Sequence, residues 1–556
     1  MFYRRFTPSG TKKSGRAINA PIAAHGLGAA NRAPTEGSGV SVHRVSTAPI
    51  DLGSWIARRA AATPKLPAIT FGENTWTYRD FADRIDRLAA ELGAGGTRRG
   101  DRVGYVGLNH PDFLVTLFAA ARIGAAFVPL NWRLTADELC YILGNAGVHT
   151  LVADAERAAV IDPVRAQAGL QRAIALAPVH GWEVVDDLLT HGAPLADPVF
   201  ADADEVAVIM YTSGTTGRPK GAMLTHANLF WNNFNALLAF DTCQHDVSLV
   251  CAPLFHIGGL NVTTLLTLQK GGQIVLMPAF DPGEALRLIA EHRVTTMFGV
   301  PAMFLFMSQH PEFADSDLSS VRHFVCGGAP VPESLIQRYG QRGIPFAQGY
   351  GLTETAPLAL VLRTDEVGAK IGAAGNQVLP LSDVRLVDAN NDPVPAGARG
   401  EICVRGPQVM AGYWRNPEAT AAVIDAEGWF HTGDIGQADD EGYVWVIDRV
   451  KDMVISGGEN VYPAEVEDVL YGHPAVAEVA VLGTPHEKWG EAVTAVVALK
   501  AGTTLTLDEL REFARGKLAA FKLPIRLEFV DALPRTQSGK VVKYQLREAL
   551  SDEPKG

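Results

Sequence analysis

The stretch YTSGTTGRPKG, residues 211–221, places four hydroxyl side chains within five residues and interleaves them with glycine. It follows the apolar strand pattern EVAVIMY (205–211) and precedes the helical pattern HANLFWNNFNALL (226–238). Glycine permits close backbone approach, so amides and hydroxyls can converge there on phosphate oxygens, and Lys220 adds a positive charge. The stretch therefore predicts an α/β fold with a phosphate-binding loop, whose glycine spacing excludes a Walker A loop.

The segments around this loop support the same fold class. From about residue 70 to residue 360, short apolar strands alternate with helical patterns, as in DRVGYVGL (101–108), the helix at 111–123 and AAFVPL (125–130). This alternation predicts parallel sheets covered by helices. From about 370 to 447, short strands separated by Gly/Pro turns predict a small β-rich subdomain.

The chain is too long for one hydrophobic core, and we predict three segments. Residues 50–448 form a large domain, and residues 449–556 form a small, mobile α+β domain with its hinge at Lys451. Residues 1–49 contain seven Lys or Arg and one acidic residue, Glu36. They are either a targeting peptide or a disordered extension. Such an extension would also result from a translation start assigned too far upstream.

Composition narrows the class of protein. With 47% hydrophobic and 20% charged residues the chain is typical of a soluble globular protein. A net charge of −12 argues against non-specific nucleic-acid binding. Five cysteines without CxxC spacing favour neither disulfides nor a zinc site and fit a cytoplasmic location. No apolar run is long enough to span a bilayer, contact with a membrane surface stays open, and the sequence gives no indication of oligomeric state.

Four further motifs stand in a fixed order after the phosphate loop: QGYGLTET (348–355), GWFHTGD (428–434), DRVKDMVISGGENVYPAEVE (448–467) and PRTQSGK (534–540). Together with residues 211–221 they resemble the acyl-adenylate-forming superfamily. The chain is most similar to its bacterial AMP-forming acyl-CoA synthetases, the fatty-acid-CoA ligases and the feruloyl-CoA type. The resemblance spans roughly residues 52–548. It implies an enzyme that uses ATP, Mg²⁺ and coenzyme A to convert a carboxylic acid into an acyl-AMP and then an acyl-CoA.

The resemblance also assigns catalytic roles. Glu354 would bind Mg²⁺, which prefers one or two carboxylates plus phosphate oxygens, and Thr353 would contact the α-phosphate. Lys540 would bridge the attacking carboxylate and the phosphate as charge develops. His256 would line the route between the acyl pocket and the thiol entry. Taken alone, Glu354 is typical of a solvated helix cap, Lys540 of a surface lysine, and His256 of a core histidine.

The nucleotide-binding assignments follow in the same way. Asp434 would accept both ribose hydroxyls, helped by Arg449, because an ionised carboxylate only accepts hydrogen bonds; taken alone it is typical of a turn aspartate. Tyr350 would stack near the adenine, and Gly457 and Gly458 would let the CoA arm pass close to the backbone. The full predicted set for ATP and CoA is Thr212, Ser213, Gly214, Thr215, Thr216, Gly217, Lys220, Gly328, Ala329, Tyr350, Gly351, Asp434, Arg449, Lys451, Gly457 and Gly458.

The acid itself is the least determined part of the prediction. Small or flexible residues at 255–261, 297–303 and 326–330 suggest a roomy apolar pocket and favour a medium- or long-chain fatty acid. An aromatic acid of the hydroxycinnamate type is the alternative. Two further hypotheses are an adenylation domain that loads a carrier protein, which a chain ending soon after Lys540 disfavours, and a non-catalytic acid-binding relative, which the filled catalytic positions disfavour.

The predicted role of Lys540 is testable in the two half-reactions separately. Lys540→Ala should slow acyl-AMP formation by about 10²–10³, because it removes one transition-state cation. Conversion of supplied acyl-AMP to the thioester should persist, because the small domain would then present residues 456–460 instead. Pyrophosphate release and CoA-dependent AMP release measure the two steps. An equal loss of both steps in a folded protein would contradict the prediction that the small domain presents Lys540 in the first step and residues 456–460 in the second.

Overall fold

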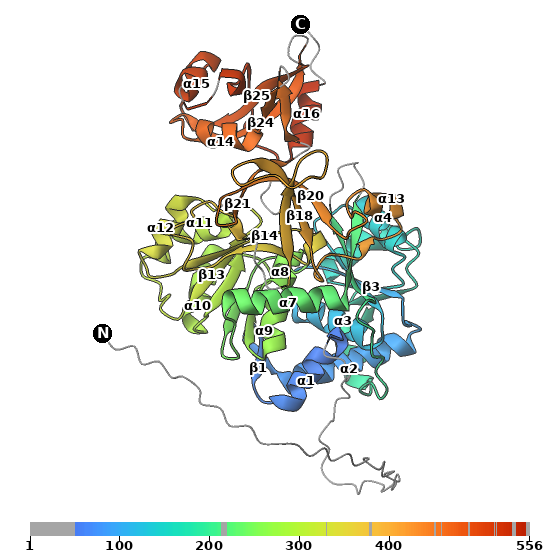
Figure 1. Ribbon diagram of the computed structural model, residues 1–556. Coiled ribbons are helices and arrows are strands. Elements are labelled where there is room, and N and C mark those ends of the chain that lie inside the picture. Colours follow the sequence, from blue (N-terminus) through green and yellow to red (C-terminus); the bar gives the residue numbers. More distant parts are fainter. Residues whose placement is uncertain are drawn as a thin grey trace, which may run out of the picture. The chain divides into compact units, whose positions relative to one another are not determined.

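The computed structural model describes residues 50–212, 219–329, 331–376, 381–449, 452–456, 459–486, 490–515, 517–518, 520–535 and 541–551. The predicted extension, residues 1–49, lies outside them. Two large sheets with their helices form one body, and a smaller sheet forms a second (Figure 1). The α/β architecture with a β-rich part and a small C-terminal domain is therefore confirmed.

The larger sheet contains thirteen strands among the described residues. Its strands β10, β11, β12, β13 and β14 are parallel, as the alternating pattern predicts. Its strand order is β17 (Asp383–Val387), β18 (Arg399–Arg405), β20 (Phe430–Ala438), β21 (Tyr443–Arg449), β16 (Gly375–Asn376), β15 (Leu358–Leu362), β14 (Phe346–Gly351), β13 (His323–Gly327), β12 (Thr296–Gly299), β10 (Val247–Val250), β11 (Gln273–Leu276), β1 (Pro67–Phe71) and β2 (Asn74–Thr77).

The predicted β-rich part is an extension of this sheet. Strand β15 pairs antiparallel with β14, and the ladder continues through β16 into β21. Gly/Pro turns show where short strands end, but they carry no information about the sheet that the strands join. The parallel half and the antiparallel half of the sheet are consequently one hydrogen-bonded structure.

The second sheet is parallel except at one edge. Its order is β19 (Gly412–Tyr413), β9 (Lys220–Thr225), β8 (Val206–Thr212), β4 (Ala126–Leu130), β3 (Arg102–Val106), β5 (Thr150–Ala153), β6 (Arg172–Ala175) and β7 (Glu183–Val184). The predicted order of strand, phosphate-binding stretch and helix is found, and a further strand, β9, stands before the helix and pairs antiparallel with β8. Strands β8 and β9 thus form a β-hairpin, and the helix begins at His226 as the pattern predicts.

Helices fill the space between the sheets and cover their outer faces. One core cluster joins β1 and β11 of the first sheet to β3, β4 and β8 of the second through helices α2, α3 and α9. Separate clusters pack α4 and α5 on the second sheet and α10, α11 and α12 on the first. The helices of the large domain are α1 (Trp55–Ala62), α2 (Tyr78–Ala94), α3 (Pro111–Arg122), α4 (Ala136–Ala146), α5 (Ala155–Ile161), α6 (Val185–His191), α7 (His226–Phe240), α8 (Ile257–Asn261), α9 (Thr264–Lys270), α10 (Pro282–Glu291), α11 (Pro301–Gln309), α12 (Glu333–Gly340) and α13 (Pro417–Ala421).

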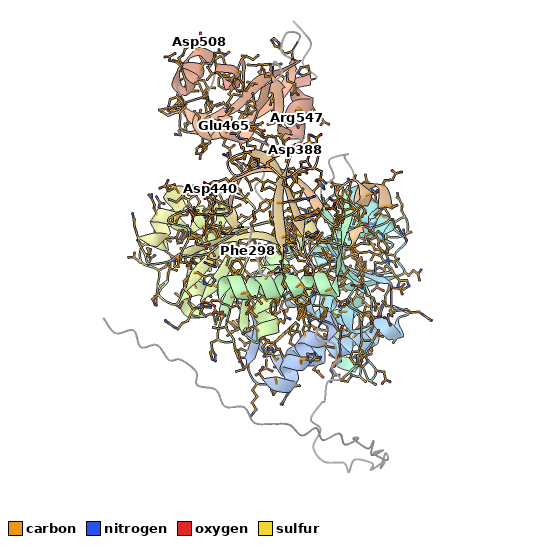
Figure 2. The ribbon with its side chains drawn as sticks, viewed as in Figure 1. Phe298, Asp388, Asp440, Glu465, Asp508 and Arg547 are labelled. Carbon is orange, nitrogen blue, oxygen red and sulfur yellow. The ribbon has the colours of Figure 1, made fainter. Side chains whose placement is uncertain are left out.

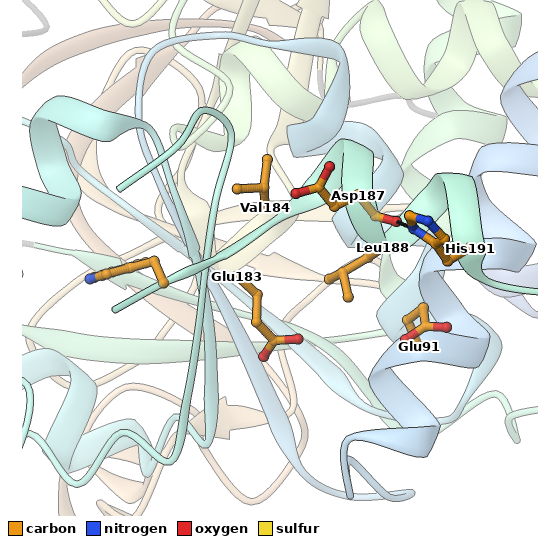
Figure 3. A pocket seen from close by; sticks show the side chains of 7 residues that line it. Glu91, Glu183, Val184, Asp187, Leu188 and His191 are labelled. Carbon is orange, nitrogen blue, oxygen red and sulfur yellow. Dashed lines mark hydrogen bonds between the residues drawn. The ribbon is translucent and has the colours of Figure 1, made fainter. Parts of the chain in front are cut away.

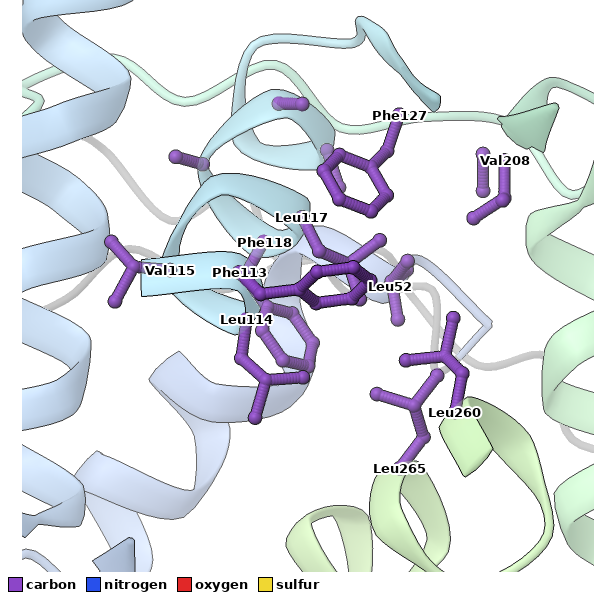
Figure 4. Packing of buried hydrophobic residues seen from close by; sticks show 14 of the residues in the cluster. Leu52, Phe113, Leu114, Val115, Leu117, Phe118, Phe127, Val208, Leu260 and Leu265 are labelled. Carbon is purple, nitrogen blue, oxygen red and sulfur yellow. The ribbon is translucent and has the colours of Figure 1, made fainter. Parts of the chain in front are cut away.

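Helix α3 lies at the centre of this core. Every one of its residues is buried, and Figure 4 shows Phe113 and Leu117 facing Leu260 and Leu265. Pro111 occupies its first turn, where the missing N–H is not needed. A helix that is apolar on all sides is stable only inside a protein, and the sequence places α3 there. Among the described residues, no helix combines the length and apolarity that crossing a membrane requires.

The C-terminal body has a core of its own. Its sheet runs β23 (Glu459–Val461), β22 (Val454–Ser456), β25 (Gly490–Leu499) and β24 (Val476–His486), with β26 (Arg526–Phe529) beside β25. Its helices among the described residues are α14 (Pro463–Tyr471), α15 (Leu507–Ala514) and α16 (Lys543–Ser551). Its main apolar cluster draws only on residues 454–523. The predicted boundary at 448/449 stays a prediction, and the hinge residue Lys451 lies outside the described residues.

A buried ion pair in the core gives a stability prediction. Arg122 at the end of α3 donates to Asp86 of α2 over 2.8 Å, and the side chains are 1% and 5% exposed. Arg122→Ala should lower the free energy of unfolding by about 3–5 kcal/mol, because it leaves a buried carboxylate without its cation. The matched control is Arg287→Ala, which breaks an exposed pair with Glu284 and should change stability by less than about 1 kcal/mol. Urea titration followed by tryptophan fluorescence measures both, and equal effects would contradict the assignment.

Candidate active site

The candidate site begins where four parallel strands end. Strands β10, β12, β13 and β14 run in the same direction, so their carboxyl ends meet at one edge of the sheet. Residues that follow these strands include His256, at the start of α8, and Gly328 and Ala329, after β13; all three are exposed. Tyr350 and Gly351 end β14 itself. Exposure of His256 rules out the alternative of a core histidine.

Glu354 and Lys220 come together around a third side chain. Glu354 lies in a short 3₁₀ turn after β14, Thr353–Thr355, and is only 8% exposed. The hydroxyl of Tyr413 donates to its Oε1 over 2.9 Å. The Nζ of Lys220 lies 5.2 Å from the centre of the Tyr413 ring. A carboxylate and an ammonium, held at one tyrosine, fit the charges of a magnesium–phosphate group.

Tyr413 is a residue that the sequence did not point to. It belongs to β19, a two-residue strand that pairs with β9, so the sheet places it beside Lys220. Burial, and then the negative charge of Glu354, raise the pKa of the Tyr413 hydroxyl, so that it stays a hydrogen-bond donor. The only signal in the sequence is a Gly-Tyr pair within a turn-rich segment, which by itself is unremarkable.

Asp434 forms a second group with Tyr350. The Tyr350 hydroxyl donates to Asp434 Oδ2 over 2.7 Å, and Asp434 is 5% exposed. Arg449 stands opposite Asp434 in the pairing of β21 with β20. The predicted residues for adenine and ribose are therefore neighbours, although 84 residues separate them in the chain.

The base of the phosphate loop is the last described element of the site. Thr212 and Lys220 are paired across the β8–β9 hairpin, with the Thr212 hydroxyl 3.5 Å from the Lys220 carbonyl oxygen. The remaining predicted residues lie outside the described residues, as does the side chain of Arg449. They are Ser213, Gly214, Thr215, Thr216, Gly217, Lys451, Gly457, Gly458 and Lys540.

Comparison with known proteins identifies the family of this chain. Residues 56–414 match the family of AMP-binding enzymes, and residues 465–540 match the AMP-binding enzyme C-terminal domain. The chain belongs to the AMP-binding enzyme family. The feruloyl-CoA synthase of an Amycolatopsis species is 48% identical over 89% of the chain and 98% of that protein.

Two other relatives show how broad this family is. The long-chain-fatty-acid–CoA ligase FadD13 of Mycobacterium tuberculosis is 38% identical over 90% of the chain and 99% of that protein. The structure of ATP-bound MatB from Rhodopseudomonas palustris is 34% identical, with a TM-score of 0.83, and covers 90% of this chain and 99% of that one. The predicted class, an AMP-forming acyl-CoA synthetase with a carboxylic acid, ATP, Mg²⁺ and coenzyme A as its partners, is confirmed.

One other cluster in this AMP-binding enzyme has metal-ligand chemistry. Atoms of Glu401, Cys403 and His431 all lie within 4.8 Å of one another. Burial, and then the charge of Glu401, raise the pKa of the Cys403 thiol to about 12. The two oxygens of Glu401 already accept hydrogen bonds from His431 and Gly433. The cluster is therefore better described as a hydrogen-bonded group.

A surface pocket lies away from the family's motifs. It has a volume of about 330 Å³ and is lined by residues of α2, β7 and α6, among them Glu91, Glu183, Asp187 and His191 (Figure 3). Three of these side chains are acidic, which disfavours an anionic nucleotide or carboxylate. The chemistry of the candidate site therefore does not extend to this pocket.

The Tyr413–Glu354 contact predicts a metal-dependent phenotype. Tyr413→Phe should lower kcat/KM for Mg·ATP by about 10–100-fold, because it removes a hydrogen bond to a charged group. The loss should be partly recovered at high Mg²⁺, because the carboxylate remains. Pyrophosphate release at varied Mg²⁺ measures it. Tyr339→Phe removes another buried hydroxyl contact, to the Phe304 carbonyl oxygen, and should leave Mg²⁺ dependence unchanged; a Tyr413→Phe enzyme with wild-type dependence would exclude the role.

Proposed function

We propose that this acyl-CoA synthetase activates a planar aromatic carboxylic acid of the hydroxycinnamate type. The observation that supports this most is the position of Phe298, near the end of β12 and within the predicted acid-lining segment 297–303 (Figure 2). Its ring is half-buried, and it lies between two glycines of neighbouring elements. A planar ring of this kind favours stacking against another planar ring.

The two glycines leave room for the Phe298 ring and for little else. A Cβ on Gly258 of α8 would lie 2.9 Å from two ring carbons of Phe298. A Cβ on Gly327 of β13 would lie 3.5 Å from a third ring carbon and 2.6 Å from the Gly349 carbonyl oxygen. The ring therefore closes the space between α8 and β13, beside the exposed His256 and Gly328.

Beyond the ring the interior is filled. Phe298 packs on a cluster that includes Val262, Leu266, Val325 and Leu358, all buried. A long alkyl chain gains about 0.8 kcal/mol for each methylene it buries, but only where space exists for it. The packing behind Phe298 thus favours a short, flat acid over a long, flexible one.

Similarity supports the same choice. The relative named as a feruloyl-CoA synthase is 48% identical, whereas the one named as a long-chain-fatty-acid–CoA ligase is 38% identical at the same coverage. The second candidate is a medium- or long-chain fatty acid. The observations in its favour are the small or flexible residues of the predicted pocket segments and the existence of this fatty-acid-ligase relative.

The proposed chemistry assigns a task to each group of residues. Glu354, oriented by Tyr413, and Lys220 would hold Mg·ATP, and Asp434 would hold the ribose. Lys540, on the small domain, would stabilise the charge that develops as the acid carboxylate attacks the α-phosphorus and pyrophosphate leaves. Rotation of the small domain about Lys451 would then bring residues 456–460 to the site, and the CoA thiolate would displace AMP.

Two further points belong to the same proposal. The separate cores of the large and small domains support a rotation of one against the other. A cytoplasmic location, with the open question of contact at a membrane surface, rests on the cysteine pattern and the absence of long apolar runs from the sequence.

An acid panel tests the substrate class. In CoA-dependent AMP formation, wild-type kcat/KM for hydroxycinnamates should exceed that for decanoate and palmitate by about tenfold or more. Phe298→Ala should shift this ratio about tenfold towards the alkyl acids, because it removes the stacking surface and opens the space behind it. Phe200→Ala, an exposed phenylalanine 41% accessible to solvent, is the control and should leave the ratio unchanged. A wild-type preference for palmitate would favour the second candidate.

A further inference from the structure

The strand that bears Asp434 is interrupted by a bulge. Glu401 stands opposite Ile435 and Cys403 opposite His431, so two steps along β18 correspond to four along β20. Three residues of β20, Thr432 to Asp434, therefore lie opposite the single residue Ile402 and leave the regular ladder with β18. Gly433 has φ +70°, a conformation that other residues rarely adopt. The bulge turns Asp434 towards Tyr350, and without it a regular strand would place the carboxylate elsewhere.

Both oxygens of the Glu401 carboxylate hold this bulge. The amide of Gly433 donates to Oε1 over 2.9 Å. The Nδ1 of His431 donates to Oε2, also over 2.9 Å. One side chain on β18 thus grips the residue before the bulge and the glycine at its apex. These two hydrogen bonds tie β20 to β18 on either side of Thr432.

The side chain of Thr432 makes two further hydrogen bonds within the bulge region. The Thr432 hydroxyl donates to the Ile402 carbonyl oxygen over 2.7 Å, and it accepts from the Asp434 amide over 3.1 Å. On the far side, His431 Nε2 lies 3.7 Å from Asp425 Oδ2, and Cys403 Sγ lies 3.4 Å from Nδ1. The imidazole of His431, the residue before the bulge, is therefore oriented from several sides.

We propose that Glu401 is a positioning residue for the nucleotide: its carboxylate fastens the Thr432–Asp434 bulge and so aims Asp434 at the ribose. The inference rests on the proposed ribose role of Asp434 and adds a residue that would itself make no contact with ATP. Its consequence is specific, because a loosened bulge loses discrimination for the ribose hydroxyls, while the contacts to phosphate and Mg²⁺ stay in place.

The test compares ATP with 2′,3′-dideoxy-ATP, which lacks both hydroxyls. Dissociation constants of the full-length protein for the two nucleotides, measured by calorimetry without acid, do not depend on which acid is the substrate. Wild type should prefer ATP by about 10²-fold, since two hydrogen bonds to a carboxylate are at stake. Glu401→Ala should reduce this preference to about tenfold or less and leave the affinity for dideoxy-ATP nearly unchanged. A general loss of stability would instead lower the affinity for both nucleotides by the same factor.

Four further variants separate the outcomes. Glu401→Gln should retain the preference for ATP, because the glutamine oxygen still accepts from the Gly433 amide. The glutamine side-chain N–H can donate to Nδ1 of His431 in the other tautomer of that ring. Thr432→Val removes the hydroxyl that bonds Ile402 and the Asp434 amide, and should lose part of the preference for ATP. This variant replaces Glu401→Ala in the test if Glu401→Ala does not fold. Asp383→Ala removes an exposed carboxylate of the same sheet and should change nothing.

Asp434→Ala distinguishes the two hypotheses. If it keeps the preference for ATP, the proposed ribose role is wrong. If it abolishes the preference while Glu401→Ala and Thr432→Val retain it, the ribose role stands and the positioning role of Glu401 is overturned. A Glu401→Gln protein as indiscriminate as Glu401→Ala would also overturn the inference, because the hydrogen-bond geometry alone would not then account for the effect.

Discussion

The hydrogen bond from Tyr413 to Glu354 joins the two sheets of the large domain at the point where chemistry is proposed. Tyr413 belongs to the edge strand β19 of the second sheet, and Glu354 follows β14 of the first. Lys220 enters from β9, the neighbour of β19. The residues proposed to bind magnesium and phosphate are therefore positioned by the packing of one sheet against the other, and the shared core around α3 maintains that packing.

The sequence and the structure agree best where a residue's role depends on its own motif. The helical pattern at 111–123 predicted α3 to within one residue, and the motifs predicted that Tyr350, Glu354 and Asp434 belong to one site. The contact of Tyr350 with Asp434 and the register of Asp434 with Arg449 bring those motifs together.

The features that were missed depend on partners distant in the chain. Strand β9 is absent from the predicted strands, because six residues after a Gly-rich turn give a weak period-two pattern, and only pairing with β8 makes them a strand. Tyr413 and Glu401 have no motif of their own. Their roles arise from a two-residue strand and from a bulge, and both are set by neighbouring strands rather than by local preference.

The narrow slot around Phe298 also limits how this enzyme could change over evolutionary time. An alanine at position 258 would drive its Cβ to 2.9 Å from the ring, so a larger residue there is tolerated only after Phe298 has become smaller. The two substitutions are therefore epistatic, and one order of acquiring them passes through a poorly folded intermediate. A lineage that changed its acid preference at this place would therefore have to substitute Phe298 first and Gly258 afterwards.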